Sequence, residues 1–278
     1  MSTLCAKKTM NEFDISSEIN QDLICHYTSL TTTIEHILFR SKLRLNRFKN
    51  SNDPFEYNEK FFTYGFGRIS NNNSVNKKAI GSNICYKLKS YIDSALFISF
   101  CQTGLSFEKD SICYLKPRMW SQYANDHSGV GLVFSKNELV KKIAENTRMD
   151  YCCGKIKYNK YDVNHDKYPS VEIPDECDFD IDQILRYYKD IFVNQMLLSK
   201  HIDYKDEDEY RLIQFDNDID YSYLDISVMV KKIVISDRIS DFGESVLRSY
   251  AEKLGSQLLL LNWSFSDVSI FDITTAST

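Results

Sequence analysis

Two glutamates and an arginine, Glu207, Glu209 and Arg211, are the residues of this sequence best placed to do chemistry together. The apolar stretch Tyr210–Ile213 predicts a strand, in which alternate side chains share a face. The two carboxylates and the guanidinium are therefore expected to project together. Burying such charges is costly and folding does not require it, so the stretch is a candidate site. The alternative is a solvated hairpin end, where runs of charge are common.

Arg211 is better explained as a brace for the carboxylates than as a catalytic group. A guanidinium holds a carboxylate through two parallel hydrogen bonds. We expect Arg211 to form such a buried pair with Glu56 or Asp53, which lie beyond a predicted turn early in the chain.

The elements that must position these residues follow from hydrophobic periodicity. Apolar runs and alternations predict strands at residues 23–27, 43–45, 95–101, 129–134, 151–158, 207–213, 228–236, 257–261 and 264–273. Helical spacing predicts helices at 30–38, from 56, at 80–92, 118–124, 181–201 and 241–254. The irregular alternation indicates an α+β fold. We expect a single domain over residues 21–278, with a flexible arm at 1–20 and loop insertions near 66–78 and 159–178.

Composition and charge exclude several classes of protein. Of the 278 residues, 43% are hydrophobic, which is enough for a globular core. The formal net charge of −5 argues against a general nucleic-acid binder but not against a local basic groove. No apolar run approaches the roughly 20 residues of a membrane span, and the N-terminus lacks the apolar core of a signal peptide. We therefore expect a cytoplasmic protein without membrane contacts.

The eight cysteines and five histidines show no spacing that is typical of a metal site. The cysteines lie mostly among apolar neighbours and are expected to act as small buried hydrophobes. Neither a Rossmann fingerprint nor a P-loop motif is present. We therefore expect no bound metal.

Five short blocks follow one another in an order that a known family shares. They are His26–Ser29, Leu43–Leu45 with Asn52–Glu56, Ile98–Phe100, Met119–Ala124 with Gly129–Phe134, and Glu207-x-Glu209-Tyr210-Arg211. In this order they resemble a bacterial family that carries only a domain-of-unknown-function label, number twenty-nine seventy-one. The chain departs from the family's pattern at Cys101, where a second Ser is usual, and at Tyr204, where Trp is usual.

The same layout is similar to that of the ADP-ribosyltransferases, which place a His or Arg, a Ser or Tyr, and a Glu-x-Glu on successive strands. His26, Ser99 and Glu207-x-Glu209 occur in that order. The resemblance implies an α+β domain in which two small, mostly antiparallel sheets form a cleft surrounded by helices. It implies NAD as the substrate and a protein, a nucleic acid or water as the acceptor of ADP-ribose. It also implies a bacterial toxin or phage-defence effector.

The resemblance assigns a role to each residue of this set. Glu209 would stabilise the positive charge that develops on the ribose as nicotinamide leaves. Glu207 would accept a proton from the attacking nucleophile. His26, supported by Thr28, would bond a ribose hydroxyl, and Ser99 would position the ribose or the second carboxylate.

Three further residues are expected to bind NAD. Trp120 or Tyr123 would stack on nicotinamide, and Arg44 would bind a phosphate. Each also has a structural explanation. Trp120 and Tyr123 are three residues apart on a predicted helix and would pack together as core, while Arg44 would be a surface residue of its strand.

His26 and Ser99 also have structural explanations, because each would be satisfied by a bond to the backbone within the core. Two other functions therefore stay open. One is a non-catalytic module on the same scaffold that senses a nucleotide or a nucleic acid. The other is a nucleic-acid-processing enzyme that uses the same carboxylates with a divalent metal.

Overall fold

The computed structural model describes residues 13–18, 22–51, 53, 56, 63–66, 74–104, 108–145, 150–160, 170–173, 180–265 and 267–274. Its largest sheet is organised around β4 (Ala95–Gln102), which is a continuous apolar run in the sequence. On one edge of β4, the antiparallel strand β10 (Glu209–Phe215) pairs along the whole length. The register runs from Ala95 opposite Phe215 to Cys101 opposite Glu209.

The opposite edge of β4 is shared by two strands that diverge. β1 (Leu23–Thr28) pairs at Cys101 and Gln102, and β2 (Lys42–Arg47) pairs at Leu96 and Phe97. Among the strand pairs of the described residues, residues 98–100 have no partner on this edge. The sheet is therefore open beside the middle of β4, at Ser99.

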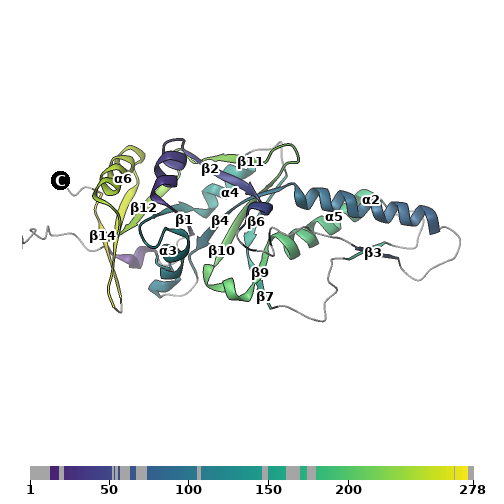
Figure 1. The fold of residues 1–278 in the computed structure, drawn as a ribbon, viewed down its shortest axis with the longest axis horizontal. Coiled ribbons are helices and arrows are strands. Elements are labelled where there is room, and N and C mark those ends of the chain that lie inside the picture. The colour runs from purple at the N-terminus through teal and green to yellow at the C-terminus, as the bar shows by residue number, and fades with distance from the viewer. Residues whose placement is uncertain are drawn as a thin grey trace, which may run out of the picture.

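The strands beyond this opening complete a ten-stranded sheet (Figure 1). From β1 the sheet continues through β5 (Val130–Ser135), β12 (Val230–Ser236), β13 (Gln257–Trp263) and β14 (Val268–Asp272). β11 (Tyr221–Asp225) borders β2, and β6 (Tyr151–Lys155) borders β10. Within this sheet only β12 and β13 pair in parallel.

Two small parallel sheets complete the strands of the described part of the chain. They pair β3 (Thr63–Phe66) with β8 (Ser170–Ile173), and β7 (Lys157–Asn159) with β9 (Ser199–His201). The α+β class is as expected and the large sheet is mostly antiparallel, as expected too, but the expectation of two small sheets is wrong. Because β4 pairs with strands on both sides of the opening, the strands of the two sides form one continuous sheet.

Three of the described helices begin at polar residues that cap them. Ser135, Asp180 and Ser240 accept the first free backbone N–H groups of α4, α5 and α6, and Gly255 ends α6 in the left-handed conformation that glycine favours. The helices are α2 (Ser74–Asp93), α3 (Pro117–Tyr123), α4 (Lys136–Ala144), α5 (Ile181–Phe192) and α6 (Asp241–Leu254). The 3-10 and π segments are η1 (Ile15–Glu18), η2 (Thr32–Leu38), η3 (Phe48–Asn50), η4 (Lys109–Ser111), η5 (Val193–Leu197) and η6 (Ile202–Glu207). In Figure 1, α2 and α5 extend together from one end of the sheet, and α6 lies at the other.

The side chains of β4 alternate between two faces, and one face has a polar interruption. Ile98 and Phe100 belong to a continuous apolar cluster with β5 and β12. On the other face, Phe97 packs with α2 and α5, while Cys101 packs with α3. Ser99 lies between these two apolar clusters, so the core itself leaves space for a polar site at the opening of the sheet.

Two predicted elements near the site have different boundaries in the structure. The helix expected over 181–201 becomes α5 and the π turn η5, and the chain then forms β9, because Lys200 pairs with Tyr158 of β7. The strand expected over 151–158 is divided at Ile156 into β6 and β7. In both cases pairing with a distant strand outweighs the local pattern.

Much of the expected arm and of both expected insertions lies outside the described residues. Within the arm, residues 13–18 contact the sheet. Phe13 donates its backbone N–H to Ile270 O, and buried Glu18 pairs with Lys232 (3.2 Å). The start of the helix expected from residue 56 lies outside the described residues except for Glu56 itself, and further along that stretch Thr63–Phe66 form the strand β3 rather than a helix. No helix in the described part of the chain is both long and apolar enough to cross a membrane.

Candidate functional site

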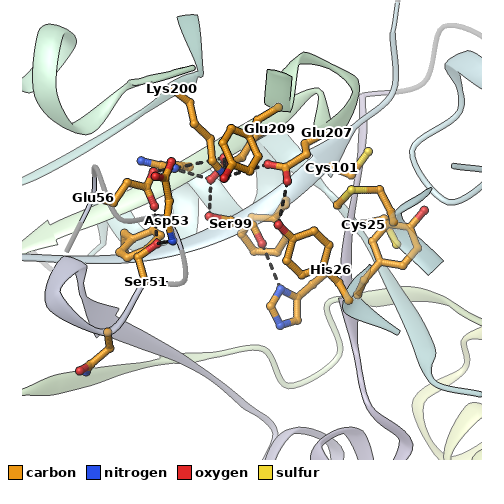
Figure 2. Close-up of a pocket in the computed structure, with 18 residues that line it drawn as sticks. Cys25, His26, Ser51, Asp53, Glu56, Ser99, Cys101, Lys200, Glu207 and Glu209 are labelled. Atoms are coloured by element: carbon orange, nitrogen blue, oxygen red, sulfur yellow. Dashed lines mark hydrogen bonds and ion pairs between the residues drawn. The ribbon is translucent and has the colours of Figure 1, made fainter. Parts of the chain in front are cut away.

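A cavity of about 260 Å³ lies on the Ser99 face of β4 (Figure 2). Strands β1, β4, β9 and β10, helix α3 and the segment after η3 all contribute to its wall. Four carboxylates and two cations are among the residues that line it. The lining residues with polar side chains are His26, Tyr27, Asn50, Ser51, Asp53, Glu56, Ser99, Tyr123, Lys200, Tyr204, Glu207, Glu209 and Arg211.

Both oxygens of the Glu209 carboxylate are engaged. Oε1 accepts hydrogen bonds from Ser99 Oγ and from Arg211 Nε (2.5 Å). Oε2 accepts from Arg211 Nη2 (3.1 Å) and Lys200 Nζ (3.3 Å). Burial raises the pKa of Glu209, but the charges of Arg211 and Lys200 outweigh it and lower the pKa to about 2. Glu209 is therefore a fixed negative charge at neutral pH rather than a proton donor.

Arg211 is fully buried and braces the site, as its spacing from Glu209 suggested. Its Nη2 also donates to Glu56 Oε1, and its Nη1 donates to Leu197 O (2.8 Å). The structure thus brings Arg211 and Glu56 together, as expected for the brace. The guanidinium also lies 5.1 Å from the centre of the Phe97 ring. A buried cation with this many partners fixes the direction of both carboxylates.

Glu207 reaches the cavity by a route that strand alternation did not predict. It is the last residue of η6, and Asp208 then adopts a left-handed conformation (φ 42°, ψ 47°) before β10 begins at Glu209. The Glu207 carboxylate accepts hydrogen bonds from Tyr123 OH (2.7 Å) and Lys200 Nζ (2.8 Å). The two glutamates therefore meet as expected, but a turn rather than a strand places the first of them.

Lys200 links the two glutamates, and the sequence did not reveal it. Its ammonium is buried between the carboxylates and lies 4.5 Å from the centre of the Tyr204 ring (Figure 2). Burial lowers the pKa of Lys200, but Glu209 and Glu207 outweigh it and raise the pKa above its ordinary value. The amphipathic pattern of residues 181–201 hid this residue within a predicted helix. Nothing in that pattern indicates the strand β9 that positions it.

His26 lines the same cavity at the opening of the sheet. Its Nδ1 lies 3.0 Å from Ser99 O, and burial lowers its pKa, so the ring is neutral at pH 7. Because a carbonyl oxygen only accepts, Nδ1 must carry the proton, and Nε2 is then an acceptor. His26, Ser99 and Glu209 thus lie around one cavity, as their order in the sequence suggested.

Three of the expected ligand-binding residues lie elsewhere. Trp120 is fully buried in the core and donates its indole N–H to Tyr114 O (2.9 Å), which matches its structural explanation. Thr28, at the end of β1, does not line the cavity. Arg44 lines a second cavity of about 400 Å³ on the other side of the opening. Tyr123, by contrast, remains 37% exposed and lines the carboxylate cavity.

No group of three His, Cys, Asp or Glu side chains in the described ranges is placed to hold a metal ion. No curated protein and no solved structure matches the chain. One family model does match, over residues 119–212, and this segment contains Tyr123, Lys200, Glu207, Glu209 and Arg211. Over that third of the chain, the resemblance to the family described as "Protein of unknown function (DUF2971)" is therefore confirmed.

Proposed function

We propose that the chain cleaves the bond between nicotinamide and ribose in NAD, as an ADP-ribosyltransferase or NAD glycohydrolase. The observation that carries the proposal is the Glu209 carboxylate, held ionised by Ser99, Arg211 and Lys200 beside neutral His26 in one cavity. A toxin or phage-defence effector is the biological role that we propose for such an activity.

The electrostatics of the cavity suit this reaction. Departure of nicotinamide builds positive charge on the ribose, as in glycoside hydrolysis. Four carboxylates against two cations leave the lining with an excess of negative charge. Glu209 is already oriented by Arg211, so it stabilises the developing charge without reorganisation. A ribose hydroxyl would replace the longest bond to Glu209, which is the one from Lys200 at 3.3 Å.

The other residues complete the reaction. Nε2 of His26 accepts a hydrogen bond from a ribose hydroxyl, and the Tyr123 ring packs on nicotinamide. The nucleophile, water or an acceptor, forms the new bond to the ribose C1′. Nicotinamide leaves with the electron pair of the broken bond, and the proton of the nucleophile passes to Glu207.

The test is consumption of NAD by the wild type, by Glu209→Gln and by Glu252→Gln, with water alone and with candidate acceptors. Glu252 is an exposed glutamate of α6 and serves as the matched control. Loss of one preorganised electrostatic contact lowers kcat by about 10²–10³, so Glu209→Gln should be nearly inactive and Glu252→Gln unchanged. If the wild type neither binds nor consumes NAD, the proposal is lost.

The fully satisfied carboxylate also favours a second candidate, a module that senses a nucleotide or a nucleic acid without chemistry. Four hydrogen bonds from Ser99, Arg211 and Lys200 engage both oxygens of the Glu209 carboxylate, as in a structural ion network. A sensing module would be stabilised against heat by its ligand, and this stabilisation would survive Glu209→Gln. An enzyme would instead lose turnover in that variant.

A further inference from the structure

The second cavity differs from the first in the sign of its charge. It lies between β1 and β2 and shares His26, Asn50, Phe97 and Ser99 with the carboxylate cavity. Its lining includes four cations and no acidic residue among those that the structure describes. The cations are Arg40, Lys42, Arg44 and Arg47.

Within the described part of the chain, none of these four cations pairs with a carboxylate. Arg47 donates to backbone carbonyls, those of Asp93 (3.1 Å) and Ile219. Arg40, Lys42 and Arg44 are exposed, and none forms an ion pair with a carboxylate of the described residues. In the first cavity, by contrast, Lys200 and Arg211 are both paired. Unpaired cations around a cavity without acids attract an anion.

The basic cavity opens onto an aromatic surface formed by β2 and β11. Lys42, Arg44 and Asn46 alternate with buried leucines along β2, so their side chains share the outer face. Tyr223 lies opposite Arg44, and Tyr221 opposite Asn46. The tyrosines are 42% and 52% exposed, and their ring centres lie 5.6 Å apart. We call these five residues the β2–β11 face; the two strands lie along the upper edge of the sheet in Figure 1.

The acidic residues near this face are already engaged. Asp225 lies opposite Lys42 in the register, and its carboxylate accepts the backbone N–H of Ser227 (2.9 Å). Asp220 pairs with Lys49 at 3.1 Å. Lys42 Nζ lies 5.8 Å from the centre of the Tyr223 ring, so this cation already contacts the face. Arg40, Arg44 and the exposed parts of the two rings are therefore the groups left for a ligand.

We propose that the β2–β11 face binds single-stranded nucleic acid. Phosphates would contact Arg40, Lys42 and Arg44, and successive bases would stack on Tyr221 and Tyr223. Aromatic rings reach the faces of bases only when these are unstacked, so a single strand fits and a duplex does not. Lys42 and Arg44 lie two residues apart on β2, roughly 6.6 Å along the strand, and Arg40 precedes them at the rim of the same cavity. This spacing favours a chain of phosphates over one small anion.

A single strand of nucleic acid bound to the β2–β11 face would also approach the proposed reaction site. The basic cavity shares Ser99 and His26 with the cavity that holds Glu209. A nucleotide bound at the end of the face would therefore be separated from the Glu209 cavity by these shared residues. The further idea that the bound nucleic acid is the acceptor of ADP-ribose rests on the proposed function. A base nitrogen or hydroxyl would form the bond to C1′, nicotinamide would leave with its electron pair, and Glu207 would take the proton. Binding itself does not depend on that reaction.

The test is fluorescence anisotropy with a short labelled oligothymidylate, an oligouridylate of equal length and a duplex, at several salt concentrations. Three phosphate contacts predict a slope of log affinity against log salt of about −2 for a single strand. Tyr221→Ala and Tyr223→Ala should each weaken binding about tenfold, while Tyr223→Phe should retain it because the ring remains. Arg44→Ala should reduce the slope by about 0.7. Tyr187→Ala and Arg186→Ala, at exposed positions of α5, should bind as the wild type does.

Each other outcome has a defined meaning. Binding of the oligonucleotide by Glu209→Gln at wild-type affinity would support the face even if NAD were never consumed. The proposal is overturned if the duplex binds as tightly as the single strands, or if the tyrosine variants bind unchanged. It is also overturned if inorganic pyrophosphate stabilises the protein through Arg44 while no oligonucleotide binds, because the cavity would then be a site for small anions.

Discussion

Ser99 donates its hydroxyl hydrogen bond to the carboxylate of Glu209, which follows it by 110 residues in the chain. The register of β4 and β10 brings them together, since Ser99 lies opposite Arg211 and Cys101 opposite Glu209. Two central strands thus hold the contact, and the carboxylate cannot turn away without breaking its hydrogen bonds to Ser99 and Arg211. Such support is what a preorganised electrostatic site requires.

Ser99→Ala should weaken both stability and activity. The substitution removes one donor from a buried carboxylate, which costs about 1–3 kcal/mol of unfolding free energy. Urea denaturation and NAD consumption would measure the two effects, and Ser99→Thr should retain most of both because it keeps the hydroxyl. Ser249→Ala, on α6, is the control. Full activity in Ser99→Ala would show that this hydroxyl does not position Glu209 for catalysis.

Arg211→Met should be among the most damaging substitutions for stability. It leaves Glu209 and Glu56 buried near each other without their shared cation, and breaking a buried pair in this way costs about 3–5 kcal/mol. Arg211→Lys should not rescue the loss, because one ammonium cannot reproduce the fork of a guanidinium. Adding Glu209→Gln to Arg211→Met should recover part of the loss. Simple additivity of the two substitutions in denaturation experiments would contradict this coupling.

Stability should fall in acid because of Glu209. Its pKa is about 2 in the folded chain against an ordinary 4.5, so the unfolded chain binds the proton more readily. The carboxylate therefore contributes its full stabilisation above about pH 5 and loses it as the pH falls toward 2, with a total on the order of 3 kcal/mol. Denaturation at a series of pH values would measure the slope. Glu209→Gln should show a smaller slope over that window, and an equal slope would contradict the assignment.

His26 should add a second dependence at higher pH. Burial lowers its pKa below the ordinary 6.5, so the unfolded chain again binds the proton more readily. The stabilisation from neutral His26 is present above pH 6.5 and declines as the pH falls below it. A histidine titration followed by NMR would give the pKa directly, with His26→Gln identifying the resonance. A His26 pKa above 6.5 would contradict the buried, neutral ring.

Period-two alternation was enough to place Glu209 and Arg211 on one face, because β10 is a regular strand from Glu209 onward. Glu207 reached the right place through a left-handed turn at Asp208, which no alternation encodes. Local periodicity could not reveal Lys200, because β9 forms only by pairing with β7. Local periodicity also could not reveal the ten-stranded sheet, because this sheet depends on which strands pair with each edge of β4.

The aromatic residues also show that local spacing does not predict which side chains reach the cavity. Trp120 and Tyr123 share one short helix, yet only Tyr123 reaches the cavity while Trp120 fills the core beside Tyr27. Ser99 carried a weak signal, because a single hydroxyl in an apolar strand is often satisfied by the backbone. The register of β4 and β10 is what places its hydroxyl within a hydrogen bond of the Glu209 carboxylate.

The divergence of β1 and β2 leaves the two sides of the opening joined through β4. Among the described strands, β4 is the one that pairs with both sides of the opening, so a small twist of the sheet about it moves the two sides against each other. Such a twist changes the widths of the acidic and basic cavities in concert, since both are bounded at Ser99. A ligand that closes one cavity would therefore alter the affinity of the other, and by linkage the coupling would be equal in both directions.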